Sequence, residues 1–407
     1  MNIFFIPSWY PSRENPTAGN FIRNQAVALG KYYQNVQVII SLWGNEGTKL
    51  NFEHPLKVLP YLINNILDKP YICEISSRVF EFNQPALEWS ARLFRGNINS
   101  ILKANEKNFQ KTQKKFGQID LIHAHVSFPA GFVAMKLAKQ YNLPYIITEH
   151  MGPFPLLPFL GNSRLMPLVL EPLKKANLVI AVSSKLQAEL WKFKIKSTVV
   201  PNLINENYFK YFPQKIGSNF NFFSLGEISK EKGFEDLVYA IAIAVKKDKN
   251  LIFRIGGNGK CLKKYQKLAQ ILKIDSEGVP FGDQNVKWLG ALNHQEVLKE
   301  FQHCNAFILP SHHESFGMVY LEALACGRAV IATCCGGPED FVRKENGLLV
   351  EKGDIQAIAS AMVKIKENIK DYPPAKIRSN ILQEYSTKVV SKKIIDLYKK
   401  IASLRSQ

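Results

Sequence analysis

The feature that most constrains the fold of this chain is an alternation of short β-branched or aromatic runs with helical patterns, which starts again half-way along the sequence. Such alternation is typical of α/β proteins with parallel sheets. The predicted strands are 2–7, 36–41, 120–124, 145–148, 178–182 and 198–200 in the first series, then 221–225, 251–255, 286–289, 306–309, 329–333 and 348–350 in the second. We therefore expect two doubly wound α/β domains.

The segment between the two series is the predicted linker. Residues 201–218 cluster Pro, Asn, Gly and Tyr without periodicity, as interdomain connections do. This linker predicts a first domain at 1–200 and a second domain at 219–374. The first domain carries an elaboration at about 51–117 that is irregular and then helical. Beyond 375 the chain is basic, and one apolar stripe predicts a helix; its members are Val389, Ile394, Ile395, Leu397, Tyr398 and Ile401.

The charge balance points to anionic partners. Lys plus Arg exceed Asp plus Glu by 19, and lysines gather at 103–115 and in the tail 375–407. Such an excess suits nucleotides, nucleic acids or acidic lipid surfaces. Six scattered cysteines without a CxxC pair favour a reducing compartment. We expect neither a signal peptide nor a membrane span, because the most apolar stretch, 156–173, is broken by charges and prolines, and hence a cytoplasmic protein.

Two glutamates separated by seven residues give the most specific chemical signal. Glu314 falls in the loop after the predicted strand 306–309, and Glu322 lies in the helix that follows. Ligands of open α/β sheets bind at such strand-end loops, and the N–H groups of Phe316, Gly317 and Met318 would form a helix N-terminus suited to phosphate. A sugar nucleotide fits this pattern: pyrophosphate on the N–H groups, sugar hydroxyls on Glu314, ribose hydroxyls on Glu322.

At these residues the chain resembles the retaining glycosyltransferases of family 4, a GT-B group with an E-x7-E motif. The resemblance extends over most of the sequence. It includes Gly226 with Lys232-Gly233, like the family's phosphate-binding element, the glycine turn around Gly257, Pro201-Asn202, Gly336-Gly337-Pro338-Glu339, Gly19-Asn20-Phe21-Ile22-Arg23 and Glu149-His150.

The resemblance implies a fold and a reaction. The fold is GT-B, two Rossmann-like domains facing a deep cleft, the first for the acceptor and the second for the nucleoside-diphosphate sugar, with the last helix crossing back to the first domain. The reaction transfers the sugar with retention, without a metal or other cofactor. Gly19 would approach the diphosphate, and His150 would orient the donor sugar and share the catalytic role with Glu314.

One residue departs from the family pattern. Where the family commonly has Gly-Arg-Leu, with the arginine on the donor diphosphate, this chain has Gly226-Glu227-Ile228. An acid would repel a diphosphate. We therefore expect that Glu227 turns away or that Lys230 and Lys232 supply the positive charge.

Histidines raise separate hypotheses. His123 and His125, two apart on a predicted strand, share a face and could ligate a metal; a structural role or, for His125, an acceptor-binding role is favoured, since no further ligands suggest themselves. His312 or His313, beside Glu314, could face the donor.

The predicted function is transfer of a sugar to a glycan, a lipid-linked oligosaccharide or a small-molecule acceptor, in the synthesis of a cell-surface polysaccharide. The alternative within enzymes is a synthase of a soluble glycoside or sugar phosphate. The alternative of another class is a basic nucleic-acid-binding protein, although no RNP, zinc-finger or helix-turn-helix signature supports it. The basic residues also predict contact with an anionic inner membrane face, without insertion.

Overall fold

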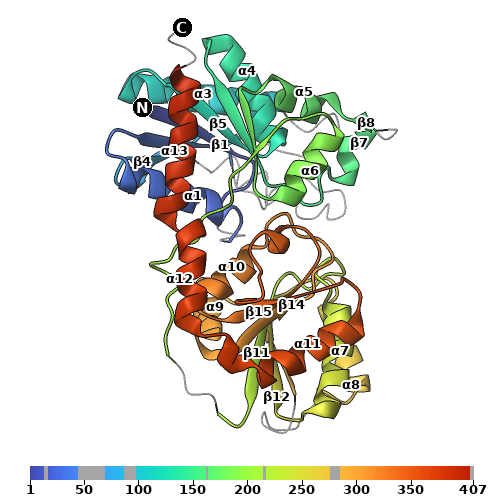
Figure 1. Ribbon diagram of the computed structural model, residues 1–407. Coiled ribbons are helices and arrows are strands. Elements are labelled where there is room, and N and C mark those ends of the chain that lie inside the picture. Colours follow the sequence, from blue (N-terminus) through green and yellow to red (C-terminus); the bar gives the residue numbers. More distant parts are fainter. Residues whose placement is uncertain are drawn as a thin grey trace. The chain divides into compact units, whose positions relative to one another are not determined.

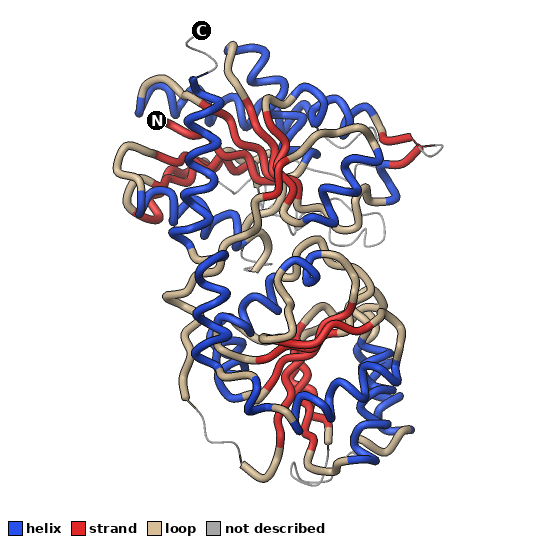
Figure 2. Tube along the Cα trace, viewed as in Figure 1, coloured by secondary structure: helices blue, strands red, loops and turns tan. Residues whose placement is uncertain are grey.

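The structure is a computed structural model that describes residues 1–12, 17–44, 69–86, 98–161, 164–213, 217–275 and 285–403. The chain divides into two compact units. Unit 1 comprises Met1–Val182, Leu186–Leu203 and Thr387–Gln407, and unit 2 comprises Ser183–Lys185 and Ile204–Ser386. In each unit the strands form a central layer with helices around it (Figure 2).

Unit 1 is built on an eight-stranded sheet in the order β10-β9-β6-β5-β1-β2-β4-β3. All neighbouring strands are parallel except β3 and β4, which are antiparallel. The strands are β1 (Asn2–Pro7), β2 (Gln37–Leu42), β3 (Tyr71–Ser76), β4 (Val79–Asn83), β5 (Leu121–His125), β6 (Tyr145–Glu149), β9 (Leu178–Ala181) and β10 (Thr198–Val199). The central strands β5 and β6 are buried at every residue, as strands of a parallel sheet covered on both faces are, although each also carries polar side chains, those of His123 and His125 and of Thr148 and Glu149.

The helices of unit 1 connect these strands. They are α1 (Asn20–Tyr32), α3 (Ile98–Phe116), α4 (Phe132–Tyr141), α5 (Pro167–Lys175), α6 (Ser184–Lys192) and the last helix α13 (Thr387–Ser403); a short hairpin pairs β7 (Leu160–Gly161) with β8 (Arg164–Leu165). Helices α1 and α13 lie side by side (Figure 1). Both contribute to one apolar core with β1 and β2.

Unit 2 is built on a six-stranded, fully parallel sheet in the order β13-β12-β11-β14-β15-β16. Its strands are β11 (Phe220–Leu225), β12 (Leu251–Gly256), β13 (Val286–Gly290), β14 (Ala306–Leu309), β15 (Ala329–Thr333) and β16 (Gly347–Val350). Its helices are α7 (Phe234–Lys247), α8 (Leu262–Ile271), α9 (His294–His303), α10 (Met318–Ala325), α11 (Ile355–Glu367) and α12 (Pro374–Tyr385). The strand order reverses direction at β11 and β14, the switch point where doubly wound sheets bind ligands.

All twelve strands predicted from the sequence are present, with ends within two residues of those expected. The prediction for 51–117 was wrong in part, because this segment also contains the strands β3 and β4. Residues 45–68 and 87–97 of that segment lie outside the described residues. Alternating apolar residues in Val79–Asn83 were a local signal for the second of these strands.

The chain leaves unit 2 at Ser386, a helix later than the expected boundary at 375. Helix α12 stays with unit 2 because Ile377 and Ile381 are buried there. In addition, Arg378 donates hydrogen bonds to the carbonyls of Phe209 and Ala325. Only α13 joins unit 1, where its buried apolar residues enter the core with β1 and α1.

The parallel sheets place the motif residues at their carboxyl edges. In unit 1, Gly19 follows β1, His125 ends β5 and His150 follows β6; in unit 2, Lys232 follows β11 and Glu314 follows β14. Within the described ranges, no helix has the length and apolar character needed to cross a bilayer.

Candidate functional site

Glu314 and Lys232 form an ion pair at the carboxyl edge of unit 2. The Lys232 Nζ donates to Glu314 Oε1 at 2.7 Å, and Ser311 Oγ donates to the same oxygen at 2.8 Å. Only 9% of the Glu314 side chain is exposed, against 29% of that of Lys232. The two residues come from the loops after neighbouring strands, β14 and β11. The structure thus brings together two predicted site residues.

The backbone of Glu314 is fixed by the glycine motif that follows β15. Its N–H donates to the carbonyl of Cys335, and its carbonyl accepts from Gly337. A Cβ at Gly336 would stand 2.2 Å from the Glu314 carbonyl oxygen, and one at Gly337 would stand 2.2 Å from Phe316 Cα. Side chains would not fit at either position, so this motif sets the path of the Glu314 loop.

Helix α10 begins directly after this loop. Gly317 is its N-cap, with φ of 88°, in the left-handed region that glycine tolerates. Among the described residues, the N–H groups of Phe316, Gly317 and Met318 have no hydrogen-bond acceptor. Three unpaired donors at a helix N-terminus favour an anion, and the phosphate-binding role of these groups stays a prediction.

Glu322 lies in the middle of α10 and is half-buried. Burial raises the pKa of its carboxyl to about 8. Within the described part of the chain its carboxylate has no hydrogen-bond partner. An unpartnered acid in a half-buried position is costly in its charged form, and it can accept hydrogen bonds from hydroxyl groups of a ligand.

Two glycine-rich loops pack against each other beside this edge. A Cβ at Gly257, whose φ is 124°, would stand 1.9 Å from the carbonyl oxygen of Gly226. Ile228 N–H donates to Asn258 O at 2.9 Å. Gly233, with φ of 67°, begins α7 and leaves no room for a Cβ beside Pro310. Gly233 therefore fixes the end of the loop that carries Lys232.

Glu227, which stands in place of the family's arginine, is exposed. Its carbonyl accepts from Ser229 N–H at 2.7 Å, and no ion pair of its side chain is present in the described ranges. Lys230 is exposed as well. Glu227 is thus open to solvent, while Lys232 is engaged with Glu314; that the Glu227 side chain turns away from the diphosphate stays a prediction.

Neighbours of Glu314 were not all recognised from the sequence. Ser311, which donates to its carboxylate, has a carbonyl that accepts a hydrogen bond from Thr333 Oγ1. His312, a candidate for facing the donor, instead pairs through Nε2 with Asp236 Oδ2 of α7 at 2.6 Å. The position of Ser311 two residues after the end of a strand and three residues before Glu314 was the available signal.

In unit 1, Gly19 is the N-cap of α1 with φ of 59°. A Cβ there would stand 2.2 Å from the carbonyl oxygen of Trp9. Only glycine allows the loop after β1 to approach α1 so closely. The flanking residues 13–16 lie outside the described residues.

Glu149 and His150 differ in their surroundings. The Glu149 carboxylate accepts hydrogen bonds from the N–H groups of Ser127, His150 and Met151 at 2.9–3.0 Å. Burial nevertheless raises its pKa. Glu149 therefore holds the backbone of the loop after β6 and thereby positions His150.

His150 and His125 form a buried pair. His150 Nε2 lies 3.1 Å from His125 Nδ1, and the two rings are stacked, with centroids 5.4 Å apart. Burial lowers the pKa of His150 to about 3 and that of His125 well below its usual value. Both rings are therefore neutral near pH 7 and act by hydrogen bonding. His125 Nε2 and His150 Nδ1 are buried without a partner among the described residues.

His123 does not support the metal hypothesis. Its Nδ1 lies 2.6 Å from Tyr398 Oη and its Nε2 lies 2.8 Å from Thr148 Oγ1, so both nitrogens are engaged. Within the described ranges, no three His, Cys, Asp or Glu side chains gather as a metal site would require. The hydrogen bonds of His123 give it a structural role.

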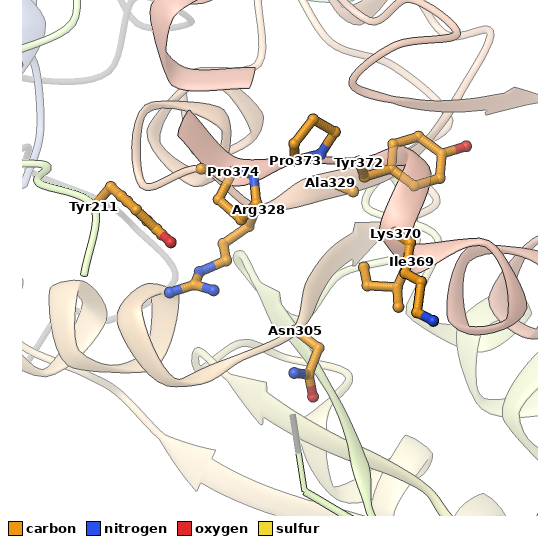
Figure 3. A pocket seen from close by; sticks show the side chains of 10 residues that line it. Tyr211, Asn305, Arg328, Ala329, Ile369, Lys370, Tyr372, Pro373 and Pro374 are labelled. Carbon is orange, nitrogen blue, oxygen red and sulfur yellow. The ribbon is translucent and has the colours of Figure 1, made fainter. Parts of the chain in front are cut away.

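A pocket of about 250 Å³ in unit 2 lies away from these residues. Asn305 and Ala329, where β14 and β15 begin, line it, so it is at the amino edge of the sheet. The guanidinium of Arg328 extends toward Tyr211, whereas the ammonium of Lys370 extends away from Tyr211 (Figure 3). Its charged groups do not converge on one point, so this pocket is not the predicted site.

Two family models match the chain. "Glycosyltransferase Family 4" matches residues 79–208, and "Glycosyl transferases group 1" matches residues 212–381. Up to Leu203 the first match lies in unit 1 except for Ser183–Lys185, and the second match lies in unit 2.

Curated relatives are glycosyltransferases. The chain is 29% identical over 252 residues to the uncharacterized glycosyltransferase MJ1178 of Methanocaldococcus jannaschii, covering 61% of this chain and 66% of that protein, just under two thirds of its length. It is 28% identical over 381 residues to the putative teichuronic acid biosynthesis glycosyltransferase TuaC of Bacillus subtilis, covering 89% of each.

Solved structures share the fold. Sucrose-phosphate synthase of Thermosynechococcus elongatus superposes with a TM-score of 0.73 at 19% identity, covering 99% of this chain and 100% of that one. HepE of Anabaena, solved in complex with UDP and glucose, gives 0.68 at 17% identity, covering 98% and 100%. At these identities the likeness shows the GT-B fold alone.

Proposed function

The chain belongs to glycosyltransferase family 4 and is a glycosyltransferase of the GT-B fold, and on this premise we propose that it transfers a sugar from a nucleoside-diphosphate sugar to an acceptor hydroxyl with retention of configuration. The observation that carries the proposal is the carboxyl edge of unit 2. There Glu314, paired with Lys232, lies in the loop whose end carries three unpaired N–H groups and leads to the unpartnered Glu322. These groups match the parts of a sugar nucleotide.

Each part of the donor has a proposed partner. The N–H groups of Phe316, Gly317 and Met318, with Lys232, bind the diphosphate. Glu322 accepts hydrogen bonds from the ribose. Glu314 accepts hydrogen bonds from the sugar hydroxyls and orients the reacting carbon. The Anabaena neighbour was solved in complex with UDP and glucose, which supports a nucleotide-linked donor.

The remaining unit 2 glycines act through the backbone. Gly226 and Gly257 are proposed to shape the loops beside the diphosphate, because a side chain at Gly257 would collide with the Gly226 carbonyl. In unit 1, Gly19 is proposed to serve the same purpose. His150, neutral and held by Glu149, is proposed to orient the transferred sugar by a hydrogen bond, and His125 to contribute to acceptor binding.

The proposed reaction balances without a protein nucleophile. The bond between the anomeric carbon and the diphosphate oxygen breaks, and a bond from the same carbon to the acceptor oxygen forms on the same face. The acceptor proton passes to the leaving diphosphate. Lys232 and the helix N-terminus stabilise the charge that develops on that leaving group, so we propose that no metal is needed.

The proposed acceptor is a growing cell-surface polysaccharide or a lipid-linked oligosaccharide. The name of the Bacillus subtilis relative, with coverage of 89% of both chains, supports this choice. The alternative is a soluble acceptor, supported by the name of the Thermosynechococcus neighbour. We further propose a cytoplasmic protein that contacts the inner membrane face through exposed lysines of α3 and α13.

The test is a thermal-shift panel with UDP, GDP, ADP and their sugars, followed by transfer assays with the sugar nucleotide that stabilises most, since a specific ligand raises apparent stability by mass action. Proton NMR of the product should show the donor's anomeric configuration, and activity should persist in EDTA. Stabilisation by polynucleotide alone would favour the nucleic-acid alternative. Activity lost in EDTA and restored by manganese would overturn the metal-free proposal.

A further inference from the structure

The last helix places one side chain against the histidines of the central strand. Tyr398 of α13 lies with its Oη 2.6 Å from His123 Nδ1 of β5, and the two residues are 275 positions apart in sequence. Both side chains have 0% exposure. A hydrogen bond so fully shielded from water holds its partners in a fixed geometry.

His123 is held at its other nitrogen as well. Its Nε2 lies 2.8 Å from Thr148 Oγ1 on the neighbouring strand β6. The Phe5 ring contacts it edge-on, with centroids 4.9 Å apart. A ring bonded at both nitrogens and packed on one side cannot rotate without leaving a buried polar atom unsatisfied.

The fixed ring of His123 lies directly against His125. The two ring centroids are 4.2 Å apart and the planes differ by 30°. His125 in turn is hydrogen-bonded to His150, and the His150 ring contacts that of Phe21 with centroids 4.7 Å apart. Phe5 also contacts His125 at 4.9 Å. Five aromatic rings thus depend on one another for their orientation.

The His125–His150 pair has two ring nitrogens that form no hydrogen bond among the described residues. In a neutral pair, one histidine donates its proton to the other, so whichever tautomers are present, one of the two outer nitrogens is a donor and the other an acceptor. These atoms are His125 Nε2 and His150 Nδ1, both buried without a partner among the described residues. Their directions, and hence what they can bind, depend on the orientation of both rings.

We propose that Tyr398 is a positioning residue for sugar transfer. Its hydroxyl fixes the ring of His123, which fixes His125 by packing and thereby the His125–His150 pair. The inference rests on the proposed function of that pair. The inference gives a role to α13, the helix with which the chain returns to unit 1 after residues 204–386 of unit 2.

The test replaces the hydroxyl and keeps the ring. Tyr398→Phe should lower kcat roughly three- to ten-fold, the range for one lost hydrogen bond, with the donor KM unchanged. The matched control is Tyr145→Phe, at the other end of β6, which removes a buried bond of 2.8 Å to the carbonyl of Pro172. Its kcat should match that of the wild type. Equal kcat values for both variants overturn the inference.

A second readout does not depend on activity. In protein labelled with ¹⁵N-histidine, the ring signals of His125 and His150 should shift in Tyr398→Phe and stay in place in Tyr145→Phe. Thr148→Val, which removes the other partner of His123, should shift the same signals. Unchanged signals in both Tyr398→Phe and Thr148→Val overturn the positioning role. If instead the signals shift while the wild type transfers no sugar, only the proposed function fails.

Discussion

Lys232 and Glu314, 82 positions apart in sequence, are joined by a hydrogen bond of 2.7 Å between Nζ and Oε1 at the end of the unit 2 sheet. The pair neutralises a carboxylate that is nearly buried. It also keeps an ammonium group on Glu314, two residues before the first of the three unpaired N–H groups at the start of α10. A diphosphate arriving there would compete with Glu314 for Lys232, which releases the glutamate to accept hydrogen bonds from sugar hydroxyls.

Removal of Lys232 should weaken nucleotide binding. We expect Lys232→Ala to lower the affinity for the nucleoside diphosphate roughly ten- to a hundred-fold, since a hydrogen bond to a charged group contributes about 1.5–3 kcal/mol. Glu227→Arg should raise the affinity. The measurement is isothermal titration calorimetry. The control is Lys366→Ala, which removes a lysine of similar exposure that pairs with Asp248 in the same unit. An affinity equal to that of the control would assign the diphosphate to another basic group.

Replacement of Glu314 should slow transfer more than it weakens binding. Glu314→Gln keeps an oxygen for Ser311 and Lys232 but loses the charge. We expect kcat to fall at least about ten-fold, as a charged hydrogen bond becomes neutral, while the nucleotide affinity changes little. Glu300→Gln, whose carboxylate pairs with Arg254, is the matched control. A kcat for Glu314→Gln as high as in this control would contradict the site assignment.

Nucleotide binding should release a proton from Glu322. With a pKa of about 8, this carboxyl is mostly protonated at neutral pH. Ribose hydroxyls favour the ionised form as a hydrogen-bond acceptor, so the affinity should increase as pH rises toward about 8. Calorimetry in two buffers of different ionisation enthalpy measures the release. Identical apparent enthalpies in the wild type would refute it, and Glu322→Gln should bind more weakly without proton release.

The buried histidines should make unit 1 sensitive to acid. Burial lowers the pKa of His123, His125 and His150, the last to about 3. In the unfolded chain these histidines are protonated near pH 6.5, whereas in the folded chain they are protonated only at lower pH. The free energy of unfolding is therefore retained above pH 6.5 and decreases as pH falls toward 3. Each histidine contributes a slope of about 1.4 kcal/mol per pH unit in this window.

Urea unfolding at about pH 7.5 and about pH 5 tests this slope. His150→Gln should show a smaller loss of unfolding free energy between the two pH values than the wild type does. The contributions of other titrating groups, such as Glu149, to the pH dependence are the same in both proteins and cancel in this comparison. Equal losses in the two proteins would show that His150 is protonated in the folded state.

Anionic vesicles should bind the protein through α3. Lys103, Lys107 and Lys111 are exposed on this helix, opposite its buried residues. Each lysine near an anionic leaflet contributes about 1 kcal/mol. Vesicles of phosphatidylglycerol and phosphatidylcholine should sediment the protein at low salt and release it near about 0.5 M salt, where screening is short-ranged.

The control for this prediction is a charge reversal elsewhere. Lys103→Glu with Lys107→Glu should reduce sedimentation, whereas Lys246→Glu with Lys247→Glu, on exposed positions of α7, should reduce it less. If the wild type does not sediment with the vesicles even at low salt, a soluble acceptor is favoured.

The sequence by itself determined the elements and the place of the site on them. The twelve strands could be recognised because a buried parallel strand is a short apolar run, a property of adjacent residues. For the same reason Glu314 was placed in a loop after a strand and Glu322 in the next helix. The glycines at 233, 317 and 336 occupy positions where the backbone leaves no other choice.

Only the tertiary structure decided which side chains meet. Lys232 meets Glu314, and Tyr398 meets His123, across separations that no local spacing encodes. It also decided that α12 stays in unit 2, because Arg378 finds its carbonyl partners there. The physical reason is that strand and helix signals come from neighbours in the chain, whereas a hydrogen bond between distant residues depends on how the finished sheets and helices pack.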